Sequence, residues 1–600
     1  MRFVWAVVAF VLATVLIGAG LAQRTIFMGP AEQRMELSVD EPAPYVVVDA
    51  DVLRAHTGLQ TLLVRGEGDV FVAYGRTADM TAWLSDTAYD HVSLTKSHKP
   101  KTQRVAARQP PADGGETSGR SPVGADLWLD SFADKDALVA KFQLTEGNSV
   151  LIARDGVQPA PDDILVSWAL DTRTPWAGPL MAAGALMLAV GIVLYILGIR
   201  HQRRGRGPRR KGPAPLPETQ PITTLPQRDE IEQQADAGTA RRTPRARRRL
   251  MVAAPALVLT GLLATGCTAD SWPQFGSDTP SPSPTPTVVT PENQKQPVVT
   301  EKQGQRIVGE IAATLAKADK GLDAELAGSR LTGAALDARK TEYTLRGAIA
   351  GRTTALVSPL DKVKVLLPEA TDGWPRTALA LTVDGADNTK PPVLLTMTQI
   401  DPWANYHVTS MAEMPASGEF PNVAPAWLGT TRVPADTAFL SLAPAAVADA
   451  FSDFVDAGDK SQYADRFDEL AQKFAQSVRD SRQAIVDGLA KANASKTSKA
   501  AFDMAPATYQ PLSLATLGSG AVVSVSVLDD QKITPTAEGA MVRFGKNPEV
   551  KALTGVSESA KGVEVVYGIQ LFFAVPAQGS TEQIRLLAYK QDLFNAKVIK

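Results

Sequence analysis

The chain has 600 residues, a formal net charge of -2 and a single cysteine. This length is enough for about three or four domains of ~150 residues, and one cysteine excludes an internal disulfide framework and any cysteine-based zinc site. The near-neutral total hides a cluster of arginines between residues 200 and 249. Because this cluster lies beside apolar segments, the positive-inside rule explains it better than nucleic-acid binding does.

Residues 3–22 form an uncharged apolar run directly after Met1 and Arg2. Such a run is long enough to cross a bilayer, which takes about 20 residues. The small residues at its end leave a removable signal peptide as the alternative, but the apolar core of a signal peptide is usually shorter, ~7–15 residues. We therefore predict a retained transmembrane helix over residues 1–23, with Met1 in the cytoplasm.

Residues 24–176 contain short, valine-rich apolar runs separated by Gly, Asp and Pro. Runs of this kind are typical of strands, and they predict a small β-rich domain outside the cytoplasm. A hydrophilic insert with Pro110-Pro111 and Gly114-Gly115 predicts a mobile loop over residues 96–123.

Asp49 and Asp51 directly follow one of the valine-rich runs. Two carboxylates at this spacing can hold a divalent metal against a diphosphate, as in many glycosyltransferases. The preceding segment is too short for a nucleotide-binding layer, so we interpret these residues as a surface turn after a strand.

A second apolar run follows Trp176 and is closed by Arg200 and further arginines. An aromatic residue at one end and positive charges at the other predict a transmembrane helix over residues 177–199 that runs from outside to inside. Residues 200–249 are rich in Pro, Arg and Gln. They contain too few large apolar side chains to fold alone, which predicts a disordered basic linker in the cytoplasm.

The segment 250–267 joins basic residues, an apolar run and the chain's single cysteine. This order resembles a lipoprotein signal, with Ala264, Thr265 and Gly266 before Cys267, and the resemblance makes Cys267 the lipidation candidate. The alternative is a third transmembrane helix, although residues 251–266 are short for one. Both interpretations place residues after 267 outside the cytoplasm, where residues 268–300 form a Pro/Ser/Thr-rich tether.

From residue 301 onward, helical and strand-like patterns alternate. Ile307, Ile311 and Leu315 have helical spacing, strand-like runs include residues 343–349, 363–367 and 393–400, and a helical region over 445–494 again precedes strands. We predict two similar α+β lobes, 301–440 and 441–600. The pattern loosely resembles the nuclear-transport-factor-2-like fold. The whole chain resembles an uncharacterised family of actinobacterial membrane proteins with a large extracytoplasmic C-terminal domain.

The sequence predicts no catalytic, cofactor-binding or metal-ligating residue. Ser93 and Lys96 match a Ser-x-x-Lys motif without its companion motifs. The aromatic residues Trp403 and Tyr406, with His407, are interpreted as part of a core. The histidines lack helix-face metal spacing; they are His56, His91, His98, His201 and His407.

The predicted function is that of a non-catalytic bacterial cell-envelope membrane protein whose extracytoplasmic domains bind a partner or ligand. Its expected partners are the membrane lipid bilayer and an envelope protein or cell-wall component, with no nucleic acid and no cofactor. The alternatives are a cell-wall enzyme, hydrolase or glycosyltransferase-like, with an unrecognised site, and a transmembrane sensor. A sensor needs a cytoplasmic output domain, for which the linker is a poor candidate.

Overall fold

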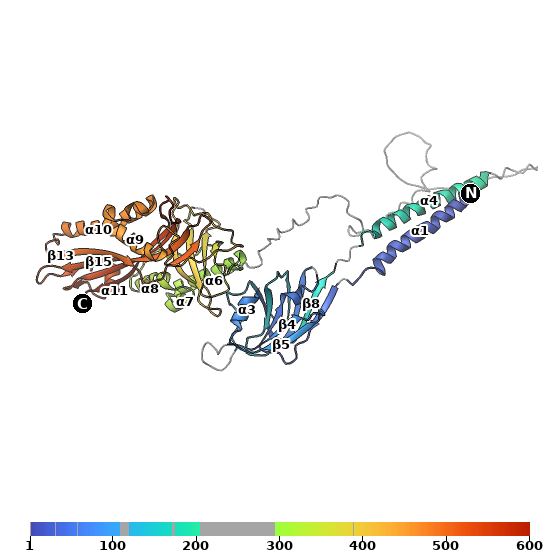
Figure 1. Ribbon diagram of the computed structural model, residues 1–600, viewed down its shortest axis with the longest axis horizontal. Helices are drawn as coiled ribbons and strands as arrows, with labels where there is room; N and C mark the ends of the chain where they lie inside the picture. Colours follow the sequence, from blue (N-terminus) through green and yellow to red (C-terminus); the bar gives the residue numbers. More distant parts are fainter. Residues whose placement is uncertain are drawn as a thin grey trace, which may run out of the picture. The chain divides into compact units, whose positions relative to one another are not determined.

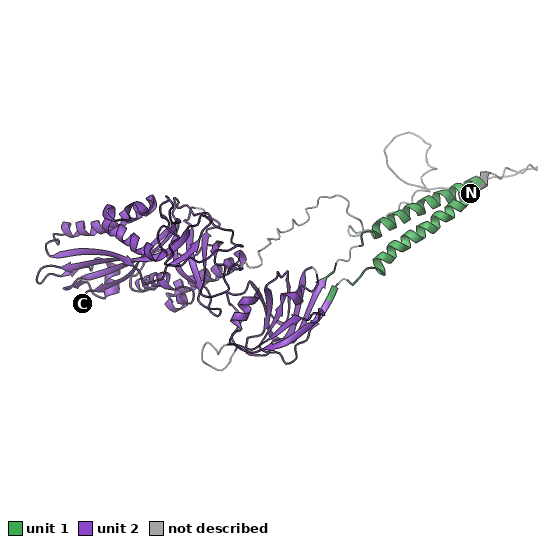
Figure 2. Ribbon diagram, viewed as in Figure 1, with its two compact units in different colours: residues 1–33, 169–288 green, residues 34–168, 289–600 purple. Residues whose placement is uncertain are grey.

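The computed structural model of the chain describes residues 2–30, 32–56, 58–108, 119–170, 174–204, 295–387 and 389–600. The contacts divide the chain into two compact units, residues 1–33 with 169–288 and residues 34–168 with 289–600 (Figure 2). The predicted linker, the segment 250–267 with Cys267, and most of the tether lie outside the described residues.

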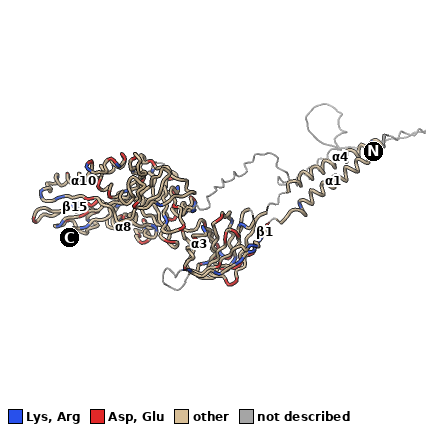
Figure 3. Tube along the Cα trace, viewed as in Figure 1, with Lys and Arg blue, Asp and Glu red and all other residues tan. Residues whose placement is uncertain are grey.

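The first unit contains a pair of apolar helices, α1 (Arg2–Thr25) and α4 (Ala177–Arg204), which lie side by side (Figure 1). Within the described residues, Phe3–Thr25 and Ala177–His201 are long and apolar enough to cross a membrane. Charged residues are sparse along both helices (Figure 3). The two predicted transmembrane segments therefore form helices, while their orientation stays a prediction.

Glycines bring α1 and α4 together. A Cβ on Gly184 would lie 2.6 Å from Cγ1 of Ile17, and a Cβ on Gly191 would lie 3.0 Å from Cε1 of Phe10. Small residues of this kind let helix backbones approach closely in an apolar environment. Both glycines of α4 therefore lie at positions where α1 approaches closely.

The N-terminal domain, residues 34–168 of the second unit, is built on a curved, barrel-like sheet. Among the described residues the sheet has eight strands in the order β1-β8-β3-β7-β2-β4-β5, with β6 paired to β3. The strands are β1 (Glu32–Leu37), β2 (Tyr45–Asp49), β3 (Gln60–Arg76), β4 (Tyr89–Leu94), β5 (Pro100–Val105), β6 (Asp130–Phe142), β7 (Asn148–Ala153) and β8 (Asp163–Ala169). Short helices α2 (Ala50–Leu53) and α3 (Thr77–Trp83) connect them, and the predicted β-rich domain is confirmed.

The predicted mobile loop over 96–123 is wrong for its first part. Residues Pro100–Val105 form β5, which pairs antiparallel with β4. Thr95 closes the turn by donating its backbone N–H to the Lys99 carbonyl at 2.9 Å. Because β5 is an edge strand without a fully buried side chain, its sequence is as polar as a loop. Residues 109–118 lie outside the described residues.

Strand β2 explains why the N-terminal domain needs cover on both faces of its sheet. Alternate residues of a strand point to opposite faces. Val46 and Val48 enter one apolar core, while Tyr45 and Val47 enter another that contains Trp83 of α3. A continuous apolar run is typical of a strand that is buried on both sides.

The C-terminal domain is organised around a sheet that both predicted lobes share. In the described part of the chain this sheet has nine strands, with β13-β15-β18-β19-β12-β11-β10-β9 in order and β14 beside β15. The strands are β9 (Lys362–Pro368), β10 (Arg376–Val383), β11 (Val393–Gln399), β12 (His407–Glu413), β13 (Ser498–Pro506), β14 (Leu512–Ala515), β15 (Ala521–Pro535), β18 (Val563–Val575) and β19 (Arg585–Val598). A small ribbon, β16 (Val542–Arg543) with β17 (Glu558–Ser559), lies apart.

The two predicted lobes meet where Glu413 of β12 pairs with Tyr589 of β19. An apolar core spans this seam, since it contains Leu379 and Leu394 from the first lobe together with Phe572 and Leu587 from the second. The lobes therefore share a sheet and a core.

Helices cover the two halves of this sheet (Figure 1). Ile307 and Ile311 of α6 pack on the first half, and Phe451 of α9 with Phe474 of α10 packs on the second. The helices are α6 (Glu301–Gly321), α7 (Ala324–Gly328), α8 (Gly333–Ala348), α9 (Pro444–Ala457), α10 (Glu469–Lys491) and α11 (Pro548–Thr554), with 3₁₀ turns at Gly458–Lys460 and Ala464–Arg466.

The strand predicted over 343–349 is wrong, because most of it belongs to α8. Tyr343 and Leu345 suggest a strand locally, but Ala334, Ala335 and Ala338 precede them on the buried side of the same helix. Helical periodicity over the longer window overrides the local preference for β structure.

Two glycines in α6 provide a matched test of how closely this helix packs on β9. A Cβ on buried Gly304 would lie 2.4 Å from Cγ2 of Val365, whereas nothing lies within 4 Å of a Cβ on exposed Gly309. We expect Gly304→Ala to destabilise the protein by about 1–3 kcal/mol through overpacking. Gly309→Ala should stabilise it by up to about 1 kcal/mol through helix propensity.

Thermal unfolding of the two purified variants measures both effects. Equal shifts in the same direction would contradict the close contact between α6 and β9.

Candidate functional site

Two features of the second unit are candidates for function: a contact between its two domains, called here the interdomain contact, and an open pocket in the C-terminal domain. The interdomain contact is centred on Arg376 at the start of β10. Its Nη2 donates to Oδ1 of Asp79 in α3 at 2.6 Å, and both residues are almost fully buried. Burial of a charge is costly unless an opposite charge compensates it. The N-terminal domain supplies the carboxylate that compensates Arg376, and the same carboxylate lies 3.8 Å from Arg76 of its own domain.

Asp126 is the second centre of the interdomain contact. It lies in the N-terminal domain with no exposed surface, and its carboxylate accepts from Nη1 of Arg330 at 2.5 Å and from the Tyr406 N–H at 2.8 Å. Its carbonyl accepts from Nε2 of Gln303 at 2.8 Å, and its N–H donates to Asn405 at 3.0 Å. One residue is thereby bonded to separate segments of the C-terminal domain.

Aromatic side chains fill the space around these charges. Trp374 and Trp403 of the C-terminal domain pack against the core of the N-terminal domain that contains Trp83. Nε1 of Trp403 donates to the Trp83 carbonyl at 2.9 Å, and the guanidinium of Arg120 lies 5.2 Å from the Trp403 ring centroid. The second face of the N-terminal sheet is thus covered partly by the other domain.

Further ion pairs, one from the buried Arg76 and one from an exposed lysine, surround these two centres. Arg76 pairs with Asp372 across the boundary and donates to the Thr371 carbonyl at 3.0 Å. The exposed Lys302 pairs with Asp130 at 2.5 Å. Exposed pairs add little stability, but they favour one orientation of the two surfaces.

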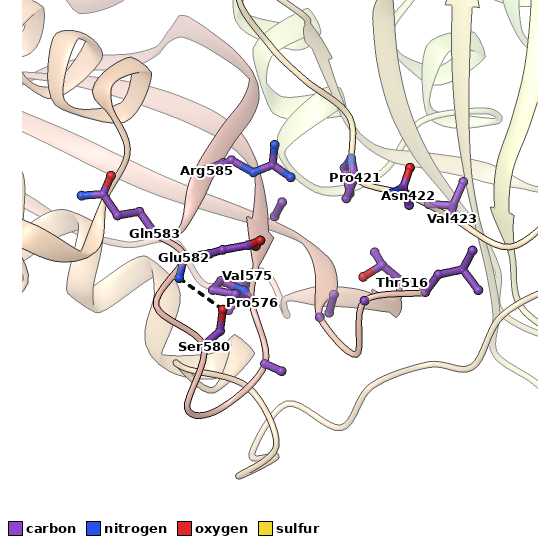
Figure 4. A pocket seen from close by; sticks show the side chains of 16 residues that line it. Pro421, Asn422, Val423, Thr516, Val575, Pro576, Ser580, Glu582, Gln583 and Arg585 are labelled. Carbon is purple, nitrogen blue, oxygen red and sulfur yellow. Dashed lines mark hydrogen bonds between the residues drawn. The ribbon is translucent and has the colours of Figure 1, made fainter.

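The open pocket lies where several strands of the C-terminal sheet end (Figure 4). It has a volume of about 550 Å³ and is bounded by residues 421–423, the turn between β14 and β15, and the connection from β18 to β19. Gly520 in that turn passes close to β18, since a Cβ at this position would lie 2.7 Å from the Val575 carbonyl oxygen. A side chain at residue 520 would therefore clash with β18. The Leu517 N–H donates to the Asn422 carbonyl at 3.1 Å and joins two walls of the pocket.

The chemistry of the pocket is mixed. Arg585 and Glu582 supply opposite charges, while Asn422, Thr516 and Ser580 supply amide and hydroxyl groups (Figure 4). Leu517 lines the pocket with 62% of its surface exposed. Such a lining can hydrogen-bond to a polar ligand and also cover an apolar group on it.

Phe439 adds a second exposed apolar side chain next to the pocket. It has 83% of its surface exposed, and its carbonyl accepts from the Gln578 N–H at 2.7 Å in the β18–β19 connection that borders the pocket. Exposed aromatic and aliphatic side chains beside polar groups are typical of surfaces that bind other polypeptides.

The residues considered for catalysis from the sequence are dispersed. Asp49 ends β2 and lies 2.8 Å from Nε2 of His91, while Asp51 is exposed on α2. His56 contacts Trp168, and Nδ1 of His407 lies 2.9 Å from the Asn405 carbonyl oxygen. Among the described residues, no group of His, Cys, Asp and Glu is arranged to hold a metal ion. Ser93 lies in β4, outside the pocket.

The aromatic residues predicted to complete a core do so at two places. Tyr406 enters the core beneath α6, and Trp403 packs at the interdomain contact. Burial raises the pKa of the Tyr406 phenol above its ordinary value. The charged residues of this contact could not be predicted from the sequence, since the partner of each across the domain boundary lies more than 200 positions away.

The family model described as "Domain of unknown function (DUF8094)" matches residues 295–598 of the chain. The chain is also 27% identical over 304 residues to a protein of Streptomyces avermitilis described as "Uncharacterized lipoprotein". This match covers 49% of the chain and 85% of the relative. No solved structure matches the chain significantly.

The pair of His91 and Asp49 predicts a pH-dependent contribution to stability. The hydrogen bond to Asp49 raises the pKa of His91 above 6.5, against the opposing effect of burial. The contribution is therefore complete below the unfolded pKa and is lost as the pH rises through the folded pKa.

We expect Asp49→Asn to lower the unfolding temperature more at pH 5.5 than at pH 8. Thermal unfolding of both proteins over this range checks the sign. A difference that grows toward pH 8 would contradict the assignment.

Proposed function

Because the chain belongs to the DUF8094 family, whose domain fills its C-terminal half, we propose that this half is a binding module of a bacterial cell-envelope membrane protein. The module acts without catalysis and takes a polypeptide segment at the open pocket. The supporting observation is the pocket itself, about 550 Å³ in volume, with exposed Leu517 in its lining and exposed Phe439 beside it.

The pocket favours binding over the enzyme alternative because of how its polar groups are arranged. Arg585 lies 3.8 Å from Glu419 and is thereby partly neutralised. The Glu582 N–H donates to Ser580 Oγ at 3.2 Å, which shapes the loop rather than activating the hydroxyl (Figure 4). Amides, hydroxyls and apolar side chains in loops at strand ends suit recognition of a peptide backbone with one apolar anchor.

We also propose that α1 and α4 cross the membrane, with Met1 and residues 205–240 in the cytoplasm and both domains of the second unit outside. The two long apolar helices and the arginines after Arg200 support this topology. The relative described as a lipoprotein supports the proposal that Cys267 becomes lipid-modified after cleavage before it.

We also propose an actinobacterial origin for the chain. A relative from Streptomyces avermitilis agrees with an actinobacterial origin. The resemblance to the nuclear-transport-factor-2-like fold stays a prediction, based on the order of helices and strands.

Reporter fusions test the topology. A phosphatase that requires export should be active when fused after Lys600 and inactive when inserted near Thr223, because the arginine cluster stays inside. The reverse pattern would contradict the proposed orientation.

Site-specific photo-crosslinking in intact cells tests the binding function. A photoreactive residue at Leu517 should give a crosslinked polypeptide product that the same residue at Val486 on α10, exposed by 40%, does not give. A second change in the pocket, Arg585→Ala, should reduce the yield at position 517 severalfold. Identical products at both positions, or no polypeptide product at position 517, would exclude the pocket as the binding site.

A further inference from the structure

The interdomain contact joins parts of the chain that are connected only through residues 169–294, which include α4 and the segment around Cys267. We propose that this contact is an autonomous protein–protein interface. The N-terminal domain and the C-terminal domain stay bound to each other when the chain between them is cut.

The first support for this proposal is the residue composition of the interdomain contact. Domains within one chain meet at high effective concentration, so a weak and largely polar contact would be enough to keep them together. Here the contact buries opposite charges from both sides, with Arg376 on Asp79 and Arg330 on Asp126. It also contains the buried Trp83, the partly buried Trp374 and Trp403, and buried arginines. Tryptophan and arginine are the residue types that contribute most to binding between separate proteins.

The second support for an autonomous interface is the distribution of the hydrogen bonds across it. Asp126 bonds to Gln303 in α6, to Arg330 after α7 and to Tyr406 before β12. These groups are held in place by the C-terminal domain's own core, in which α6 and Tyr406 take part. A preorganised surface of this kind loses little conformational freedom on binding.

The comparisons supply the third argument. The family model begins at residue 295, so the domain that it defines does not include residues 34–168. The family model thus treats the C-terminal domain as a unit of its own, separate from the N-terminal domain that it contacts.

The proposal has a consequence for this chain if cleavage occurs before Cys267. The cut would leave α1, α4 and the N-terminal domain on one product and the C-terminal domain on the other. The interdomain contact would then hold a membrane protein and a lipoprotein together as a two-chain complex. The interface itself does not depend on that cleavage or on the open pocket, so this test and that of the proposed function fail independently.

The full chain with a specific protease site inserted between residues 285 and 290 provides the test, in a Cys267→Ala background that keeps the chain intact. The protein is immobilised in detergent through a tag before Met1 and then cut. The released fragment carries neither the apolar helices nor residues 250–267, so only the interface can retain it. We expect most of the fragment to stay bound through repeated washes.

Asp126→Ala should release the fragment at least roughly tenfold faster, because it removes the fully buried carboxylate that pairs with Nη1 of Arg330 across the contact and leaves this guanidinium only Glu310 of its own domain. The matched control is Asp163→Ala, which removes an exposed carboxylate that pairs with Arg65 within the N-terminal domain at 3.3 Å. The control should behave like the unchanged protein.

A surface pair provides a variant that leaves the folded core untouched. Lys302 has 75% of its side chain exposed, so Lys302→Glu should speed release severalfold by charge repulsion with Asp130. The swap Lys302→Glu with Asp130→Lys should restore retention. The proposal is overturned if the unchanged fragment leaves in the first wash, or if Asp126→Ala and Lys302→Glu both retain it as the unchanged chain does.

Discussion

The pairing of buried charges across the interdomain contact is the constraint on which the arrangement of the second unit depends. Arg376 is fully buried and Asp79 almost so. Asp79 also lies 3.8 Å from Arg76 of its own domain, but Arg376 would lose its carboxylate partner if the domains separated. Because one charge lies in each domain, the position of α3 is fixed relative to β10 within this unit. A buried ion pair adds little net stability, but it penalises every arrangement that leaves one of its charges unpaired.

The same contact explains an otherwise puzzling feature of the N-terminal domain. A small sheet that buries apolar residues on both faces needs cover on both faces. One core is enclosed by the curvature of the sheet itself, while the other is closed by α3 and by Trp374 and Trp403 from the C-terminal domain. The domain boundary is therefore also part of a hydrophobic core.

Local sequence patterns predicted individual helices and strands well, but they did not predict how these elements pack together. The apolar runs around α1 and α4, the valine-rich strands and the helical spacing of Ile307 and Ile311 are signals carried by neighbouring residues. The polar edge strand β5 and the helical residues 343–348 were misassigned, because each has a composition typical of another structure. The pocket and the interdomain contact could not be predicted from the sequence for a different reason. They are formed by residues such as Asp126 and Arg330, which become neighbours only after folding and whose types are common on any surface.

The bonds of Asp126 also determine how the two domains can come together. Its carboxylate Oδ2 and its backbone are bonded to α6, to Arg330 and to the segment before β12 at the same time, while the buried Oδ1 has no hydrogen-bond partner among the described residues. A partly engaged arrangement would desolvate this aspartate and supply only some of its partners, which costs more than leaving it in water. Docking of the domains is consequently cooperative: they engage completely or not at all, and intermediate poses are sparsely populated.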